Sequence, residues 1–225
     1  MVERTGHALF VREFFRHPVR TASLVPSSSA LAARMAERVP ATGDPVVVEL
    51  GPGTGAFTGA LQELLGGRGR HVAIDLNPRM TGHLARRFPR VEVVEDSADA
   101  LPRILAGLGT GPADLVVSGL PFTVFENGER PLVDTIASVL APGGAYTQFS
   151  YSWTRWAAPA RRQRARVRAA FAGVETGRTV WRNFPPAFVY VATGPLSPAA
   201  LPAPAPAATV GKAVEVGGVV GVGGG

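Results

Sequence analysis

The chain of 225 residues contains no cysteine, which excludes disulfides, thiolate metal sites and thiol nucleophiles. Histidine is scarce too: His7, His17, His71 and His83 have no ligand-like spacing, so we expect surface or packing roles and no bound metal. No apolar run approaches the roughly 18 residues that span a bilayer, and charged residues near the N-terminus interrupt any signal-peptide core. These absences favour a cytoplasmic protein.

Lysine is almost absent as well, because Lys212 is the only lysine and the formal charge of +6 comes from arginine. One arginine cluster lies near the N-terminus and another in a segment expected to be helical from Ala157. Two interpretations stay open, a solvated helix face or contact with an anionic surface or phosphate group. The clusters are Arg12, Arg16 and Arg20, and Arg161, Arg162, Arg164, Arg166 and Arg168.

The most informative segment is VVVELGPGTG, residues 46–55, in which a β-branched run reaches Glu49 and three glycines then alternate with other residues. The amphipathic segment AFTGALQELL follows, so the pattern predicts a strand, a tight turn and a helix. Glycines there let a ligand approach the main chain, and the expected ligand is a nucleoside-bearing cofactor. Gly51, Gly53 and Ala56 also satisfy the looser dinucleotide fingerprint, which keeps an NAD-binding alternative open.

The order E-x-G-x-G-x-G runs from Glu49 to Gly55 and includes Thr54. It resembles motif I of class I S-adenosylmethionine-dependent methyltransferases. The resemblance implies that Glu49 supports the loop and the methionine end of the cofactor. A second strand-like run ends in Asp75, followed by Leu76. Asp75 lies 20 residues beyond Gly55, where an acidic side chain can accept both ribose hydroxyls.

A third strand-like run, VEVVED, ends in Asp96, and Ser97 opens a short helical pattern. In the methyltransferases that the chain resembles, an aspartate here accepts from the adenine amino group while small or aliphatic neighbours flank the ring. The resemblance therefore implies an adenine site at Asp96 and Ser97. A helix N-cap is the other interpretation of Asp96.

Strand-like and helical segments alternate after two N-terminal helical segments, the second of which is capped by Ser27 or Ser28. This order predicts a Rossmann-like α/β fold with a seven-stranded, mostly parallel sheet and helices on both faces. The last two expected strands are joined at Pro185-Pro186, which is too short for a crossover, so one strand should be antiparallel. Strands are expected near 46–50, 72–75, 91–95, 115–118, 145–150, 179–184 and 188–193, and helices from Gly55, Pro78, Ala98, Pro131 and Ala157.

We divide the chain into an N-terminal helical segment (1–40), a methyltransferase domain (41–194) and a tail (195–225). In the first segment Phe10 and Phe14 lie one helical turn apart with charged residues between them, which predicts an amphipathic helix. The tail is rich in Pro, Ala and Gly and has no aromatic anchor, so we expect it to be disordered.

The fourth expected strand leads into Ser118-Gly119-Leu120-Pro121-Phe122, the position of methyltransferase motif IV beside the transferable methyl. Ser118 is expected to contact the cofactor, and Leu120, Pro121 and Phe122 the acceptor, because ligands bind at the carboxyl ends of strands in such sheets. The rRNA adenine dimethyltransferases have N-L-P-Y here, whereas this chain has Gly119 and Phe122 in place of Asn and Tyr. Losing the amide disfavours base methylation and a nucleic-acid partner.

Over residues 8–193 the combined motifs are similar to those of bacterial phospholipid N-methyltransferases of the soluble type. The shared segments include FF…HP…VPSS, VELGPGTG, D-NP…RFP, VVSGLP, LAPGG and NFPPA-VY. The resemblance implies stepwise methylation of a lipid acceptor, phosphatidylethanolamine, toward phosphatidylcholine. It also implies that the N-terminal amphipathic helix touches an anionic membrane, which would place the protein peripherally at the inner face.

The implied chemistry is in-line transfer of the sulfonium methyl, for which the protein aligns the nucleophile and excludes water. An amine with a pKa near the ~10 of lysine must first lose a proton. Glu126 and Tyr151 are the candidate acceptors, and water at an open interface is the alternative. The rings of Phe122, Tyr151, Trp153 and Trp156 can bind methylated ammonium groups, although core or lid packing is the other interpretation of the two tryptophans.

Three other functions stay open at this point. A soluble small-molecule methyltransferase would work equally well without a bilayer. An RNA adenine methylase, or an inactive binding relative, is suggested by the arginine-rich helix and opposed by Gly119. An NAD oxidoreductase is the most distant alternative.

Overall fold

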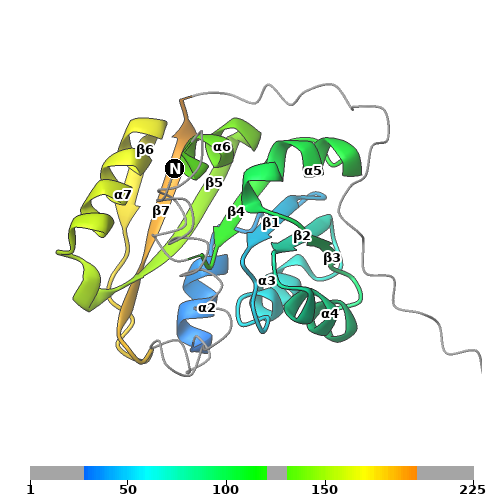
Figure 1. Ribbon diagram of the computed structural model, residues 1–225, viewed down its shortest axis with the longest axis horizontal. Helices are drawn as coiled ribbons and strands as arrows, with labels where there is room; N and C mark the ends of the chain where they lie inside the picture. The colour runs from blue at the N-terminus through cyan, green and yellow to red at the C-terminus, as the bar shows by residue number, and fades with distance from the viewer. Residues whose placement is uncertain (1–27, 121–130, 197–225) are drawn as a thin grey trace, which may run out of the picture.

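The computed structural model describes residues 28–120 and 131–196. Three expected segments lie outside the described residues. They are the N-terminal amphipathic helix, residues 121–130 of the loop after the fourth expected strand, which we call the acceptor loop, and residues 197–225 of the tail. In the described part, one mixed sheet lies between two layers of helices (Figure 1). The strands are β1 (Val46–Leu50), β2 (Arg70–Asp75), β3 (Glu92–Glu95), β4 (Ala113–Ser118), β5 (Leu140–Tyr151), β6 (Phe171–Thr176) and β7 (Ala187–Pro195).

Three helices cover each face of the sheet. On one face, Leu31 and Leu61 pack with Val47 of β1, while Leu84 packs on β2. On the other face, Ile104 and Ile136 belong to a second core that includes the remaining side chains of β1 and β2. The first group is α2 (Ser29–Ala36), α3 (Thr58–Leu65) and α4 (Pro78–Arg87), and the second is α5 (Leu101–Leu108), α6 (Leu132–Val139) and α7 (Ala158–Ala170).

The central strands read as continuous apolar runs because they are buried on both faces. All five residues of β1 are buried, including Glu49, and so are the last four of β4. The helix starts follow local rules: the Ser28 side chain accepts from the Leu31 N–H, and Asn77 caps α4 ahead of Pro78. The expected cap at Ser28 is confirmed. None of the helices in residues 28–120 and 131–196 is long and apolar enough to cross a membrane.

The strand order is β3-β2-β1-β4-β5-β7-β6, with β7 antiparallel to both of its neighbours and the other adjacent strands parallel. The predicted fold class is therefore confirmed. The chain adds strands outward from β1 toward β3, then returns to place β4 on the other side of β1. This reversal lies between β1 and β4, where ligands bind at the carboxyl ends of the strands in open α/β sheets.

One strand was predicted at the wrong place. Residues 179–184 form only an isolated bridge, Val180 to Ala187, and the sixth strand is 171–176, directly after α7. Both segments lie along the same edge of β7: residues 171–176 pair with it from Pro195 to Tyr190, whereas Val180 meets it only at Ala187. The hairpin that makes β7 antiparallel is therefore longer than expected, with residues 177–186 as its connection.

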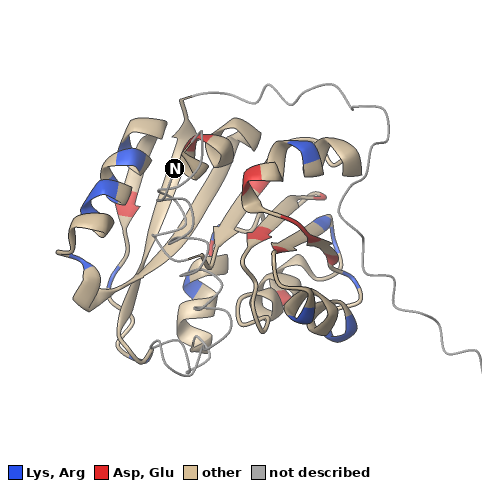
Figure 2. Cartoon of the chain, in the orientation of Figure 1, with Lys and Arg blue, Asp and Glu red and all other residues tan. Residues whose placement is uncertain are grey.

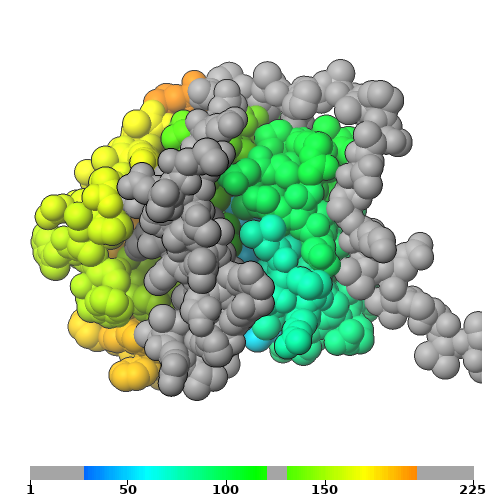
Figure 3. All heavy atoms as spheres, in the orientation of Figure 1, coloured from blue at the N-terminus to red at the C-terminus, as the bar shows by residue number. Residues whose placement is uncertain are grey.

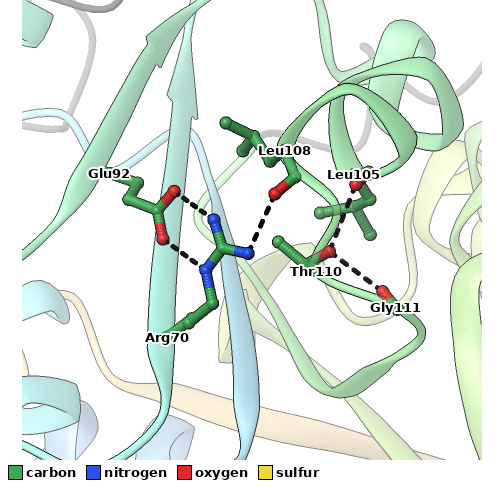
Figure 4. A network of polar contacts seen from close by, with 6 residues as sticks. All are labelled: Arg70, Glu92, Leu105, Leu108, Thr110 and Gly111. Carbon is green, nitrogen blue, oxygen red and sulfur yellow. Dashed lines mark hydrogen bonds and ion pairs between the residues drawn. The ribbon is translucent and has the colours of Figure 1, made fainter. Parts of the chain in front are cut away.

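Two sets of polar contacts fix elements that are distant in sequence. At the amino end of the sheet, the Arg70 guanidinium forms an ion pair with Glu92 of β3 and donates to the Leu108 carbonyl of α5 at 3.0 Å (Figure 4). On the opposite edge, the Ser28 N–H donates to Asn183 Oδ1 at 2.9 Å, and Thr147 Oγ1 donates to the Met35 carbonyl at 2.9 Å. Helix α2 is thereby attached to β5 and to the 177–186 connection.

Candidate active site

Four loops meet at the carboxyl edge of the sheet. Leu50 of β1 is in register with Ile74 of β2 and with Ser118 of β4, and Asp75 is in register with Glu95 of β3. Backbone hydrogen bonds continue past the strands, from Gly51 N–H to the Ile74 carbonyl and from Gly119 N–H to the Leu50 carbonyl. The structure thus brings together the residues expected to bind the cofactor.

Glu49 is fully buried beneath the glycine turn. Its Oε2 accepts from Thr58 Oγ1 at 2.7 Å and lies 3.3 Å from His71 Nε2, while Gln62 contacts His71 Nδ1 at 3.0 Å. Glu49 Oε1 has no hydrogen-bond partner among the described residues. The carboxylate therefore connects β1 to the first turn of α3 and lies against the His71 ring of β2. Sequence reasoning gave His71 no part in this cluster, although its position on the neighbouring strand was the available signal.

Asp75 connects the glycine turn to the exit of β2. Its Oδ2 accepts from the Gly53 N–H at 3.3 Å and its Oδ1 from the Asn77 N–H at 2.9 Å, with only 3% of the residue exposed. Burial raises the pKa of Asp75, while the N–H groups of Asn77 and Gly53 act in the opposite direction. A carboxylate has about four acceptor positions, so it can still accept from ribose hydroxyls.

The glycine turn is open on one side and packed on the other. Gly51, Gly53 and Gly55 all have left-handed φ angles, from +54° to +86°. A Cβ on Gly53 would meet nothing within 4 Å, whereas one on Gly55 would lie 2.7 Å from the Phe88 ring. The open side of Gly53, with Asp75 beside it, is a cradle that fits the nucleoside end of S-adenosylmethionine.

The third loop carries Asp96 and Ser97. Asp96 Oδ1 accepts from the Ser97 N–H at 2.7 Å, and Oδ2 forms an ion pair with Arg103 at 2.6 Å. The short 3-10 helix that follows is capped by Ser97, whose side chain accepts from the Asp99 N–H, so the N-cap interpretation of Asp96 is wrong. Leu76, next to Asp75, has 57% of its surface exposed and can flank an adenine ring.

The fourth loop approaches the glycine turn at Gly119. A Cβ on Gly119 would lie 2.7 Å from the Gly51 carbonyl oxygen, a backbone atom that cannot rotate away. Ser118 Oγ accepts from the Leu120 N–H at 3.3 Å. The asparagine of the rRNA adenine dimethyltransferases therefore does not fit here without moving the backbone. Gly119 in place of asparagine therefore has a steric reason as well as a chemical consequence.

The expected acceptor residues are only partly described, because Pro121, Phe122 and Glu126 lie outside the described residues. Tyr151 is half-buried at the end of β5, with Phe149 in edge contact at 5.4 Å between ring centroids. Burial raises the pKa of Tyr151, so its phenol stays protonated at neutral pH. Trp153 and Trp156 follow it, 67% and 75% exposed.

A buried amide pair supports the acceptor loop and was not expected from the sequence. Gln148 Nε2 donates to the Leu120 carbonyl at 3.4 Å, and Gln163 Nε2 of α7 donates to Gln148 Oε1 at 3.3 Å. Buried amides need such partners. A glutamine at the fourth residue from the end of a buried strand was the available signal.

The fold and the four loops define a class I S-adenosylmethionine-dependent methyltransferase. Residues 47–144 match the model of the methyltransferase domain family. The chain is 36% identical over 146 residues to the ornithine lipid N-methyltransferase of Singulisphaera acidiphila, a match that covers 63% of this chain and 76% of that protein. The chain therefore belongs to the class I S-adenosylmethionine-dependent methyltransferases, and S-adenosylmethionine is its cofactor.

Solved structures agree on the fold. The precorrin-6y C5,15-methyltransferase of Geobacter metallireducens superposes with a TM-score of 0.58 at 16% identity, over 77% of this chain and 92% of that one. A SAM-dependent O-methyltransferase of Thermotoga maritima gives a TM-score of 0.54 at 13% identity, over 80% and 70% of the two chains. At such identities the likeness concerns the fold alone.

Proposed function

We propose that the protein N-methylates the primary amine of a membrane-lipid headgroup, either phosphatidylethanolamine or an ornithine lipid. The observation that carries the proposal is the 36% identity to an ornithine lipid N-methyltransferase along three quarters of that relative. The close approach of Gly119 to the Gly51 carbonyl supports it, because it leaves no room for a side chain that would hold an adenine acceptor.

We assign cofactor binding to the residues at the carboxyl edge. The cofactor supplies a methyl group on positively charged sulfur, already activated for attack by an amine. Asp75 would accept from the ribose hydroxyls while retaining its bonds to the Gly53 and Asn77 N–H groups. The negative charge of Glu49 favours the cationic methionine end. The remaining residues assigned to the cofactor are Gly51, Thr54, Gly55, Leu76, Asp96, Ser97 and Ser118.

We assign acceptor binding to the loop after β4 and to the end of β5. The buried Gln148 fixes the Leu120 carbonyl, which orients the start of the loop that continues into Pro121 and Phe122. Trp153 and Trp156 stay candidates for contact with the headgroup. Rings in such a site attract methylated ammonium groups by roughly 0.5 to 2 kcal/mol each, depending on how fully water is excluded.

The amine must be deprotonated before it attacks, since an ammonium group has no lone pair. The raised pKa of Tyr151 makes it a poor proton acceptor at neutral pH, because only a phenolate can take a proton. We therefore assign the proton to Glu126 and give Tyr151 the role of orienting the amine through its phenolic oxygen.

Transfer of label from methyl-labelled S-adenosylmethionine tests the proposal. The purified protein is incubated with phosphatidylethanolamine or ornithine lipid in detergent micelles, and label is counted in the lipid fraction. Phosphatidylcholine is the matched control, because its nitrogen already carries three methyl groups. We expect label on one or both amine lipids and none on phosphatidylcholine. Equal transfer to free ethanolamine or ornithine, or label on RNA, would replace the lipid with another acceptor.

A further inference from the structure

All three tryptophans of the chain are exposed. Trp153, Trp156 and Trp181 have 67%, 75% and 78% of their surfaces accessible, and Phe184 has 75%. Tryptophan is among the more buried residues on average, so three exposed examples with no buried one call for an external partner. Removing such rings from water on a partner surface offsets the cost of their exposure.

These side chains come from two segments that meet in space. Tyr151 pairs with Ala187, and the Ser152 N–H donates to the Pro186 carbonyl at 2.8 Å, which joins the end of β5 to the 177–186 connection. Arg155 lies over the Trp156 ring at 5.8 Å and lines an open depression of about 720 Å³ together with Arg178 and Trp181. We name Trp153, Trp156, Trp181, Phe184, Arg155 and Arg178 the aromatic-arginine rim.

The charge around the rim is mostly positive. Residues 131–196 contain eight arginines but only Asp134 and Glu175 as acids. Figure 2 shows basic positions along α7, which begins two residues after Trp156. The depression also includes Arg34, which pairs with Glu37 at 3.1 Å. Within residues 28–120 and 131–196 no carboxylate forms an ion pair with Arg155 or Arg178, so their charge is available to an anionic partner.

The rim is held to the body of the enzyme. Asn183, between Trp181 and Phe184, is buried; its Oδ1 accepts from the Ser28 N–H, and its Nδ2 donates to the Pro185 carbonyl at 2.7 Å. Strand β6 is parallel to β5, so the 177–186 connection starts from the same carboxyl edge as the acceptor loop. The exposed rings therefore have a fixed position relative to the active site.

Exposed tryptophans beside arginines match the chemistry of a bilayer interface. Indole rings favour the headgroup level of a membrane, and arginines near an anionic surface each contribute about 1 kcal/mol of attraction. An RNA strand also binds arginines and rings, but Gly119 removes the side-chain position that would read a base. The observations therefore favour lipid.

We propose that the aromatic-arginine rim docks on an anionic lipid bilayer and holds the carboxyl edge of the sheet against the headgroups. This contact is separate from the N-terminal amphipathic helix expected from the sequence. The proposal rests on the proposed lipid function in one respect, since a lipid substrate gives docking its benefit. Docking itself requires no methyl transfer. Phe184 and Trp181 enter the interface while Arg178 and Arg155 pair with lipid phosphates.

Cosedimentation with vesicles tests the rim in the full chain. The vesicles contain equal parts of phosphatidylglycerol and phosphatidylcholine, with pure phosphatidylcholine as the neutral comparison. The double variant Trp181→Ala/Arg178→Glu should bind the anionic vesicles at least about tenfold more weakly than the wild type. The matched control Leu64→Ala/Arg86→Glu, with the same kinds of exposed change on α3 and α4, should bind like the wild type.

Fluorescence gives a second measurement that does not depend on affinity. In the variant Trp153→Phe/Trp156→Phe, Trp181 is the only remaining indole, so its emission should shift to the blue on anionic vesicles and be quenched by brominated acyl chains. An unchanged Trp181 emission, or equal vesicle binding by wild type and rim variant, overturns the proposal. Salt-dependent binding to RNA but not to vesicles also overturns it.

The two proposals fail separately. Methylation of amine lipid in micelles needs no docked bilayer, so the Trp181→Ala/Arg178→Glu variant should retain it while losing most activity on vesicles. A wild type that binds vesicles but methylates no lipid contradicts the proposed function and leaves the rim intact. A rim variant that methylates vesicle lipid at the wild-type rate contradicts the proposal that the rim docks on the bilayer.

Discussion

The cofactor half and the acceptor half of the molecule use charge in different ways. Residues 28–120 contain nine arginines and ten acids, and several of the carboxylates are bound into the fold, as in the pairs Arg70–Glu92 and Arg103–Asp96. Residues 131–196 contain eight arginines and two acids. Figure 3 shows cyan and green residues of the first part on one side and yellow and orange residues of the second part on the other. In the proposed site, the cofactor contacts backbone groups and buried carboxylates, whereas the acceptor contacts a basic surface.

The largest expected effect concerns Gly119, at the end of the cofactor half where the acceptor loop begins. Gly119→Asn places a Cβ against the Gly51 carbonyl, and we expect it to lower the free energy of unfolding by about 2 to 3 kcal/mol. Gly143→Asn is the matched control, since a Cβ there meets nothing within 4 Å. Urea unfolding measures both. Equal stability of the two variants would show that the loops separate easily and would reopen the adenine interpretation.

Gly53→Ala sharpens the assignment of the cofactor half. Its φ of +54° and the open space around it predict a stability loss of about 1 kcal/mol and a fall in cofactor affinity of about tenfold or more. Gly109→Ala, at φ +61° with equally open space behind α5, should lose similar stability and keep full affinity. Titration calorimetry with S-adenosylmethionine compares them. If Gly53→Ala and Gly109→Ala bind S-adenosylmethionine equally well, the cofactor does not bind at the open side of Gly53.

Asp75 predicts a pH dependence. In the proposed site, cofactor binding uses the carboxylate form of Asp75. Burial raises the pKa of this group above the ordinary 3.8, so affinity should begin to fall at a higher pH than for an exposed aspartate. For stability the sign is opposite: the contribution of this group is fully present below the unfolded pKa and is lost as pH rises through the folded pKa. Asp75→Asn should bind about tenfold more weakly near neutrality and lose the pH dependence, as measured by calorimetry.

Tyr151→Phe should have the smallest effect. A phenol whose pKa is raised by burial is protonated at neutral pH, so removing its oxygen should lower kcat by roughly threefold or less. The slope of rate against pH should stay as in the wild type. A loss of more than tenfold together with a changed pH profile would make Tyr151 the proton acceptor and remove that role from Glu126.

Sequence patterns predicted the cofactor half well because its signals are local. The apolar run before Gly51 and the Ser28 cap each depend on a few neighbouring residues, and both appear in the structure. The acceptor half depends on distant pairings. Residues 179–184 have strand-like composition, but residues 171–176 occupy the β7 edge. Similarly, Gln148 is a structural residue only because Leu120 and Gln163 reach it from elsewhere in the chain.

The reversed direction of β7 also keeps the 177–186 hairpin apart from the strands that carry the cofactor motifs. Because the chain returns through residues 177–186 as a hairpin, extra residues there lengthen a loop without moving any strand that carries a cofactor motif. The same hairpin lies beside the end of β5. Changes in this hairpin can therefore alter the proposed aromatic-arginine rim while the strands that carry the cofactor motifs keep their positions.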